Sequence, residues 1–349
     1  VCPVFRAVTE AQAALAAEEV SKAYLPPEGV AAFNAGIQSL VLGGSHPALV
    51  GGRVSSVQAP GGCGALRIGA EIIYAASADA RVWVSDPTWP VHLPLLGSVG
   101  LSFESYRYYD PASHGVNFDG MVEDLKQARP GDVVLLHGCC HNPCGADLSL
   151  AQWQVIAGMA ETQGFMPFVD IAYQGLGDGL EEDAAGLRLL AERVPEMIVA
   201  ASCSKNMGLY RERTGATLFI GKTRDNAEAL VSQALVAARR VYSMPPAHGA
   251  LIAGRILGDA ELGELWRTEL VDMCGRINRL RTTLRERLEA SSGGDGAFLE
   301  QERGLCSFLG LSAVEALELR EAHSVYVMNW SRMSVAGVDA GSLVYVAGG

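Results

Sequence analysis

The sequence lacks an apolar run long enough to cross a membrane. A spanning helix needs about 20 predominantly apolar residues, and the longest apolar runs in these 349 residues are interrupted by Gly, Asp or His. Basic residues are also few: 27 Lys and Arg stand against 39 Asp and Glu, which gives a formal net charge of −12. Nucleic-acid binding depends on clustered basic side chains that neutralise phosphates. We therefore expect a soluble protein that does not act on nucleic acid.

A secretory signal is also missing. The first residues, Val1-Cys-Pro-Val-Phe, contain neither an initiator Met nor a basic segment followed by an apolar one. We therefore expect the chain to begin inside a longer protein. Its eight cysteines are too sparse for the disulfide framework of a small secreted domain. We interpret them as reduced thiols of a cytoplasmic protein, or of one in an organellar matrix if a leader preceded the chain.

A glycine-rich turn matches no nucleotide-binding pattern. The sequence predicts a strand over 54–59, a turn at Pro60-Gly-Gly-Cys-Gly64 and a helix over 65–74. The turn has neither the G-x-G-x-x-G spacing nor the Gly-Lys-Ser/Thr ending of a P-loop. Backbone N–H groups at the start of a helix can still hold an anion. The turn is therefore either a phosphate site or a purely steric device.

Short apolar runs alternate with amphipathic helices through the middle of the chain. Strands are predicted over 81–85, 101–109, 132–137, 165–170, 197–201 and 215–221, with helices near 118–129, 149–163, 184–194 and 225–240. This alternation predicts an α/β fold with a mostly parallel central sheet flanked by helices. A long charged helix over 262–288 then leads to short strands and a helix over 311–322. We expect a large domain over 1–270 and a smaller α+β domain over 271–349.

Polar residues follow three of the predicted strands. Lys205 comes after one strand, and Asp170 ends another, with Tyr173 three residues on. His137 ends a third strand, and Asn142 follows it. Ligands of α/β proteins usually bind at the carboxyl ends of the strands, and a desolvated lysine forms Schiff bases readily. A Schiff-base lysine, an acid for a ring nitrogen and a phosphate cradle together indicate pyridoxal 5′-phosphate (PLP) as the cofactor.

Other interpretations of these residues stay open. Cys139, Cys140, His141 and Cys144 could hold zinc, although adjacent cysteines on a strand point to opposite faces and no second Cys-x-x-Cys pair exists. Cys140 beside a histidine could be a nucleophile, although no feature indicates a lowered pKa of its thiol. Lys205 could also simply extend into solvent.

Four segments, in order along the chain, carry a family pattern: Cys140-His-Asn142-Pro-Cys-Gly, Asp170-Ile-Ala-Tyr173-Gln-Gly, Ser202-Cys-Ser-Lys205-Asn-Met-Gly-Leu-Tyr-Arg-Glu-Arg213-Thr-Gly and Ser331-Arg332-Met-Ser-Val-Ala-Gly337. They resemble the class I, fold type I aspartate and aromatic aminotransferases. The resemblance implies the PLP-dependent transferase fold type I and a ping-pong transamination between aspartate, or tyrosine or phenylalanine, and 2-oxoglutarate. The motifs do not separate the two subgroups.

The resemblance also implies a role for each matching residue. The catalytic residues are Lys205, as Schiff-base lysine and proton shuttle, Asp170 and Tyr173. The cofactor site is Gly62, Cys63, Trp89, His137, Asn142, Asp170, Tyr173, Ser202, Lys205 and Arg213, with Tyr24 from a partner subunit. The substrate site is Arg332, Arg239, Trp89 and Asn142. Arg332 is expected to clamp the α-carboxylate, and Arg239 of the other subunit to receive a side-chain carboxylate. His137 is expected to orient Asp170. The implied assembly is a homodimer with shared active sites and no metal.

The sequence departs from the family pattern at several points. Cys63 and Cys144 stand where the family usually has hydroxyl residues. From the resemblance we expect the family's N-terminal arm to be absent and its final helix to be cut short at Val346-Ala-Gly-Gly349. A truncated PLP-fold protein with little or no activity is therefore an alternative. Another is a related PLP enzyme that decarboxylates or eliminates, which the pair of substrate arginines disfavours.

Overall fold

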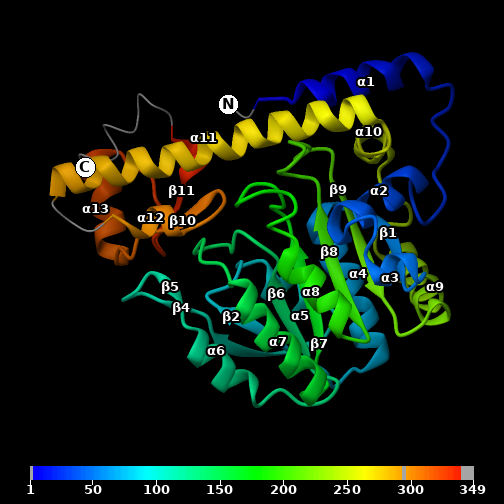
Figure 1. The fold of residues 1–349 in the computed structure, drawn as a ribbon, viewed down its shortest axis with the longest axis horizontal. Helices are drawn as coiled ribbons and strands as arrows, with labels where there is room; N and C mark the ends of the chain where they lie inside the picture. The colour runs from blue at the N-terminus through cyan, green and yellow to red at the C-terminus, as the bar shows by residue number, and fades with distance from the viewer. Residues whose placement is uncertain (1–2, 293–295, 339–349) are drawn as a thin grey trace.

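The structure, a computed structural model, describes residues 3–292 and 296–338 (Figure 1). The predicted early stop at 346–349 lies outside the described residues. A seven-stranded sheet in the order β1-β9-β8-β7-β6-β2-β3 forms the centre. Its strands are β1 Val54–Pro60, β2 Arg81–Asp86, β3 Ser102–Arg107, β6 Val133–His137, β7 Met166–Ile171, β8 Met197–Ser202 and β9 Thr214–Ile220. Strand β9 is antiparallel to both of its neighbours and every other neighbouring pair is parallel, which confirms the mostly parallel sheet.

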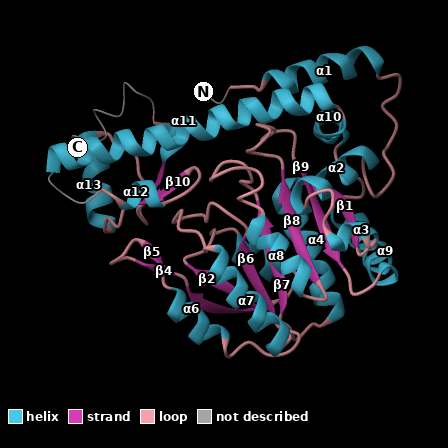
Figure 2. Cartoon of the chain, viewed as in Figure 1, coloured by secondary structure: helices cyan, strands magenta, loops and turns pink. Residues whose placement is uncertain are grey.

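Helices cover both faces of this sheet (Figure 2). Strand β8 shows how: Ile198 and Ala200 belong to one buried cluster, whereas Val199 and Ala201 belong to the other, as the two-residue period of a strand requires. The first cluster includes α4 (Gly61–Ala76), α5 (His92–Gly97) and α9 (Arg224–Val241). The second includes α1 (Arg6–Glu18), α2 (Ala31–Leu42), α3 (Pro47–Val50), α6 (Phe118–Leu125), α7 (Leu150–Gln163), α8 (Ala185–Arg193) and α10 (Ala247–Gly258).

One local prediction was wrong, and one helix was not predicted. The glycine-rich segment 60–64 was expected to be a turn, but α4 already begins at Gly61. Gly61 has a φ of +68°, a left-handed conformation that favours glycine, and a Cβ atom there would lie 2.6 Å from a guanidinium nitrogen of Arg213. Helix α10, whose buried residues are Gly, Ala and Ile, was not predicted.

Helix α11 (Ala260–Ser292) extends from α1 and α10 to the C-terminal segment (Figure 1). Around its far end lie α12 (Phe298–Gln301), β10 (Cys306–Phe308), α13 (Ala313–His323), β11 (Arg332–Ser334) and a 3₁₀ turn over Val335–Gly337. Residues of α11, α12, α13, β11 and the 3₁₀ turn form a separate hydrophobic cluster that includes Leu284, Leu299 and Met333, whereas Phe308 of β10 packs against the main cluster. A further strand pair, β4 (Tyr109–Asp110) with β5 (Gly115–Val116), lies apart from the main sheet. The domain boundary near residue 270 stays a prediction.

Within the described ranges, no helix combines the length and the apolar character that crossing a bilayer would require. The seven cysteines of these ranges are free thiols.

A buried ion pair ties α11 to the segment that follows it. Arg281 Nη1 lies 3.0 Å from Glu302 Oε2, and the two side chains are 2% and 1% exposed. Removing one partner of such a pair leaves an uncompensated charge in the interior. Arg281 also donates to the carbonyl oxygens of Leu299, Gly304 and Cys306, so the same side chain holds the loop between α12 and β10.

We expect Glu302→Ala to lower the free energy of unfolding by about 3–5 kcal/mol, because Arg281 would stay buried without its partner. The matched control is Glu300→Ala, which removes a partly exposed pair with Arg285 at 2.7 Å. That change should cost less than about 1 kcal/mol. Urea denaturation of the two variants and the parent measures the difference, and equal losses would contradict the structural role of the buried pair.

Candidate active site

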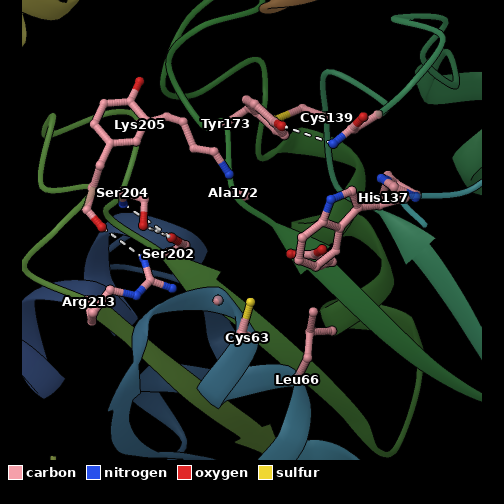
Figure 3. A pocket seen from close by; sticks show the side chains of 15 residues that line it. Cys63, Leu66, His137, Cys139, Ala172, Tyr173, Ser202, Ser204, Lys205 and Arg213 are labelled. Atoms are coloured by element: carbon pink, nitrogen blue, oxygen red, sulfur yellow. Dashed lines mark hydrogen bonds between the residues drawn. The ribbon is translucent and has the colours of Figure 1, made fainter. Parts of the chain in front are cut away.

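The carboxyl ends of three neighbouring parallel strands meet at one cavity. His137 ends β6 and pairs in register with Asp170 of β7, which pairs with Ala200 of β8, just before Lys205. The cavity has a volume of about 220 Å³. It is lined by Gly62, Cys63, Leu66, Trp89, His137, Cys139, Asn142, Asp170, Ala172, Tyr173, Ser202, Ser204, Lys205, Tyr210 and Arg213 (Figure 3).

The structure brings most of the predicted site residues to this cavity, but not all of them. Tyr24 is 90% exposed and does not line it. Arg239, near the end of α9, is also exposed. Arg332 lies on β11, where its Nε is 3.2 Å from the sulfur of Cys306. The lining residues that sequence reasoning missed are Leu66, Cys139, Ala172, Ser204 and Tyr210, most of them close neighbours of predicted positions.

Lys205 is half-buried at the edge of the sheet. Its Nζ lies 4.5 Å from the ring centroid of Tyr173, and both side chains point into the cavity (Figure 3). Burial lowers the pKa of Lys205, and the negative charge of Asp170 opposes this shift only in part. The amine therefore loses its proton at a lower pH than an ordinary lysine, as a nucleophile or a base requires.

The two carboxylate oxygens of Asp170 differ in their hydrogen bonding. Its Oδ2 lies 3.0 Å from His92 Nε2, whereas its Oδ1 is buried without a hydrogen-bond partner among the described residues. Burial favours the neutral acid, but the His92 hydrogen bond and nearby positive charges, including Lys205, outweigh it and hold the pKa of Asp170 below its ordinary value. An ionised carboxylate only accepts, so His92 Nε2 is the donor.

The prediction that His137 orients Asp170 was wrong. His92 does so, with Thr88 Oγ1 2.8 Å from its Nδ1. His137 lies beside Thr88 at 3.3 Å, and burial lowers the pKa of His137 well below its ordinary value. No sequence signal separated the two histidines, because His92 is 78 residues away from Asp170 and only the fold brings them together.

An anion cradle lies where α4 starts. The guanidinium of Arg213 lies next to the first turn of this helix, 2.6 Å from where a Cβ atom of residue 61 would be. Ser202 Oγ accepts from the backbone N–H of Ser204 at 3.1 Å and donates to the Ser204 hydroxyl at 3.0 Å. The positive end of a helix, a guanidinium and hydroxyl groups together suit a phosphate. Gly62 and Cys63 line the cavity at the same helix start.

Three further predicted residues, Asn142, Tyr173 and Trp89, line the cavity. Asn142 Nδ2 donates to the hydroxyl of Tyr173 at 3.3 Å, and burial raises the pKa of Tyr173 well above its ordinary value. Trp89 packs edge-on against His92, with ring centroids 5.3 Å apart. The hydrogen bond and the ring packing hold these side chains in place at the cavity.

The four candidate zinc ligands do not converge in the structure. Cys139 and Cys140 lie with Asp183, their ligand atoms all within 4.8 Å of one another, but His141 instead contacts Cys144 at 3.1 Å. Asp183 already accepts three backbone N–H groups. The hydrogen bond to Cys139 and burial raise the pKa of the Cys140 thiol well above its ordinary value. Cys140 also does not belong to the residues that line the cavity, so its position does not support the role of a nucleophile at this site.

A desolvated lysine, a carboxylate with a free buried oxygen and an anion cradle, all at the carboxyl edge of a mixed sheet, define a transferase that uses PLP. The chain belongs to the aminotransferase class I and II family, which it matches over residues 3–348. The predicted family, fold type and cofactor are thereby confirmed, and transamination is the activity that the family membership supports.

Relatives with both predicted specificities resemble the chain closely. It is 41% identical to the aromatic-amino-acid aminotransferase of Paracoccus denitrificans, over 99% of this chain and 87% of that protein. It is also 41% identical to the aspartate aminotransferase of Escherichia coli, over 96% of this chain and 85% of that protein. The crystal structure of the Burkholderia pseudomallei aromatic-amino-acid aminotransferase, covalently bound to pyridoxal phosphate, superposes with a TM-score of 0.97. The two sequences are 40% identical, and the superposition covers 99% of this chain and 87% of the Burkholderia chain. These relatives favour an active transaminase over the inactive alternative.

Proposed function

We propose that the protein transfers an amino group between aspartate, or tyrosine or phenylalanine, and 2-oxoglutarate. The observation that carries the proposal is the pairing of Lys205, whose pKa burial lowers, with an ionised Asp170 that keeps one buried oxygen free. Relatives named for both substrate classes are equally similar to the chain. A panel of amino acids and 2-oxo acids, assayed in both directions, tests the proposal.

The residues present fit the cofactor. Oδ1 of Asp170, buried and without a partner in the described chain, is suited to accept from a protonated ring nitrogen. The cradle of Arg213, Ser202 and the start of α4 suits a phosphate. The amide and phenol of Asn142 and Tyr173, already hydrogen-bonded to each other, suit a ring oxygen. When bound, PLP supplies an electron sink for the carbanion that forms at the substrate Cα.

The chain's own residues then bind the substrate and move its proton. Lys205, whose pKa burial lowers, is proposed to take the proton from the substrate Cα. In the reverse half-reaction it is proposed to return the proton to Cα. Arg332 is proposed to pair with the α-carboxylate, because a guanidinium matches a carboxylate through two parallel hydrogen bonds. Both half-reactions use the same groups in opposite directions, which gives ping-pong kinetics.

We further propose a homodimer that shares its active sites. Tyr24 and Arg239, which the family resemblance assigns to the site, are exposed and lie outside the cavity of their own chain. A partner chain could bring both of them to the cavity. Light scattering measures whether the protein is a dimer. Mixing an inactive Tyr24 variant with an inactive Lys205 variant tests the shared site, because mixed dimers should regain activity. A cytoplasmic location is also proposed, in keeping with the free thiols of the described cysteines.

We expect Arg239→Asp to lower kcat/KM for aspartate by about a hundredfold or more, because an attraction for the side-chain carboxylate becomes a repulsion. The value for phenylalanine, which lacks that carboxylate, should fall less than about threefold. Arg224→Asp, in the exposed first turn of the same helix, is the control. Steady-state kinetics with both substrates measures the effect, and equal losses on the two would remove the role assigned to Arg239.

A further inference from the structure

Cys306 lies between two residues of the candidate substrate site. Its sulfur is 3.2 Å from Arg332 Nε and 4.0 Å from Asn142 Oδ1, and the residue is 2% exposed. A guanidinium can only donate, so the sulfur is the acceptor of the Arg332 bond. The thiol proton is then available for Asn142 Oδ1. The Cys306 thiol thus accepts a hydrogen bond from Arg332 and donates one to Asn142.

This contact completes a continuous polar chain. Asn142 accepts from Cys306 through Oδ1 and donates to the Tyr173 hydroxyl through Nδ2 at 3.3 Å. Arg332 is thereby connected, through Cys306 and Asn142, to the residue whose ring lies beside Lys205 Nζ. The hydrogen bond from Arg332 Nε to the Cys306 sulfur fixes the orientation of the guanidinium plane. Its two Nη groups can then donate to a carboxylate.

The backbone around Cys306 is held from two sides. Its carbonyl oxygen accepts from Nη2 of the buried Arg281 at 2.6 Å. On the other side β10 pairs antiparallel with β11, with Cys306 opposite Ser334 and Phe308 opposite Arg332. The sulfur and the guanidinium therefore belong to one rigid strand pair, which fixes their separation.

We propose that Cys306 is a positioning residue for the substrate α-carboxylate: it orients Arg332 and couples it to Asn142. The inference rests on the proposed function, because it assumes that Arg332 binds a carboxylate. It extends that function by assigning the orientation of the arginine to a thiol that neither the family motifs nor the cavity lining includes. The role is acceptance and donation of hydrogen bonds by the intact thiol, without covalent change.

The test compares Cys306→Ala with Cys306→Ser. Alanine removes both hydrogen bonds, so KM should rise about tenfold for the amino acid and for the 2-oxo acid alike, as expected for a lost bond to a charged group. The affinity for 3-phenylpropionate, a carboxylate that cannot react, should fall by the same factor in calorimetry. kcat should change less than about threefold, because the arginine binds substrate and transition state equally. Serine can donate and accept, so it should restore KM to within about threefold of the parent.

Cys274→Ala is the matched control. Cys274 is a buried cysteine of α11 whose thiol contacts the Gly177 carbonyl oxygen at 3.2 Å, away from Arg332. It should leave KM and 3-phenylpropionate affinity unchanged. The proposal is overturned if Cys306→Ala leaves both quantities unchanged, or if serine is as impaired as alanine. Failure of the proposed function looks different: the parent protein would show no amino transfer, while the 3-phenylpropionate comparison would still report whether Cys306 positions Arg332.

Discussion

Lys205→Ala should abolish amino transfer, with a fall in kcat of about ten-thousandfold or more. The side chain combines two roles at one place: a neutral amine for covalent attachment of the cofactor and a base for the substrate proton. Loss of a general base alone costs about 10²–10⁴ in rate. Burial lowers the pKa of Lys205, and no other lysine lines the cavity in the described ranges, so no neighbour can substitute for it.

Kinetics with aspartate and 2-oxoglutarate measure this loss. A second measurement is borohydride treatment followed by peptide mapping, which should attach PLP to the parent protein at residue 205 and leave the variant unlabelled. Lys222→Ala, an exposed lysine just beyond β9, is the control and should keep full activity and labelling. A Lys205→Ala protein with the turnover of the parent would refute the mechanism proposed here.

Asp170→Asn should lower kcat by about a hundredfold to a thousandfold, the range typical for removing one preorganised electrostatic group. The asparagine keeps the size of the side chain but lacks the charge that a protonated ring nitrogen needs beside it. It also leaves His92 Nε2 without its ionised partner. Asp170→Glu, which keeps the charge, should retain more activity than Asp170→Asn. Asp79→Asn, at an exposed position, should be unaffected.

The same substitution has a consequence that does not depend on turnover. The charge of Asp170 raises the pKa of Lys205, against the larger lowering by burial. Without that charge the pKa of Lys205 falls further, so at any given pH more of the amine is deprotonated. In cofactor-free protein, the pH profile of Lys205 labelling by an amine-reactive reagent should therefore shift to lower pH in Asp170→Asn. An unchanged or opposite shift would show that the two groups do not interact.

Much of the fold could be predicted because its strands are short apolar runs with clear ends. Strand β8, for example, ends in Ser202 at the position where the apolar pattern stops, and the long charged helix predicted over 262–288 is present as α11. Two features near the site were not predicted. Helix α10 buries mostly Gly, Ala and Ile residues, and α4 begins within the glycine-rich segment, at Gly61, next to the Arg213 side chain.

The residues of the candidate site also fall into those that the sequence could predict and those that it could not. Lys205, Asp170 and Asn142 could be identified because each follows a predicted strand and belongs to a family motif. His92 and Cys306 could not, because their importance comes only from what they touch: Asp170 for the histidine, Arg332 for the thiol. Contacts between residues so far apart in sequence depend on packing, which no local pattern encodes.

The sequence by itself indicated the chemistry of the site. A lysine, an acid and a glycine-rich turn at strand ends favoured PLP chemistry over the zinc and thiol alternatives, because residue type and strand position are local properties. Only the tertiary structure decided how those groups are tuned: which histidine holds Asp170, which of its oxygens stays free, and what orients Arg332. Burial and hydrogen-bond partners set pKa values and side-chain directions, and both arise only when distant segments pack together.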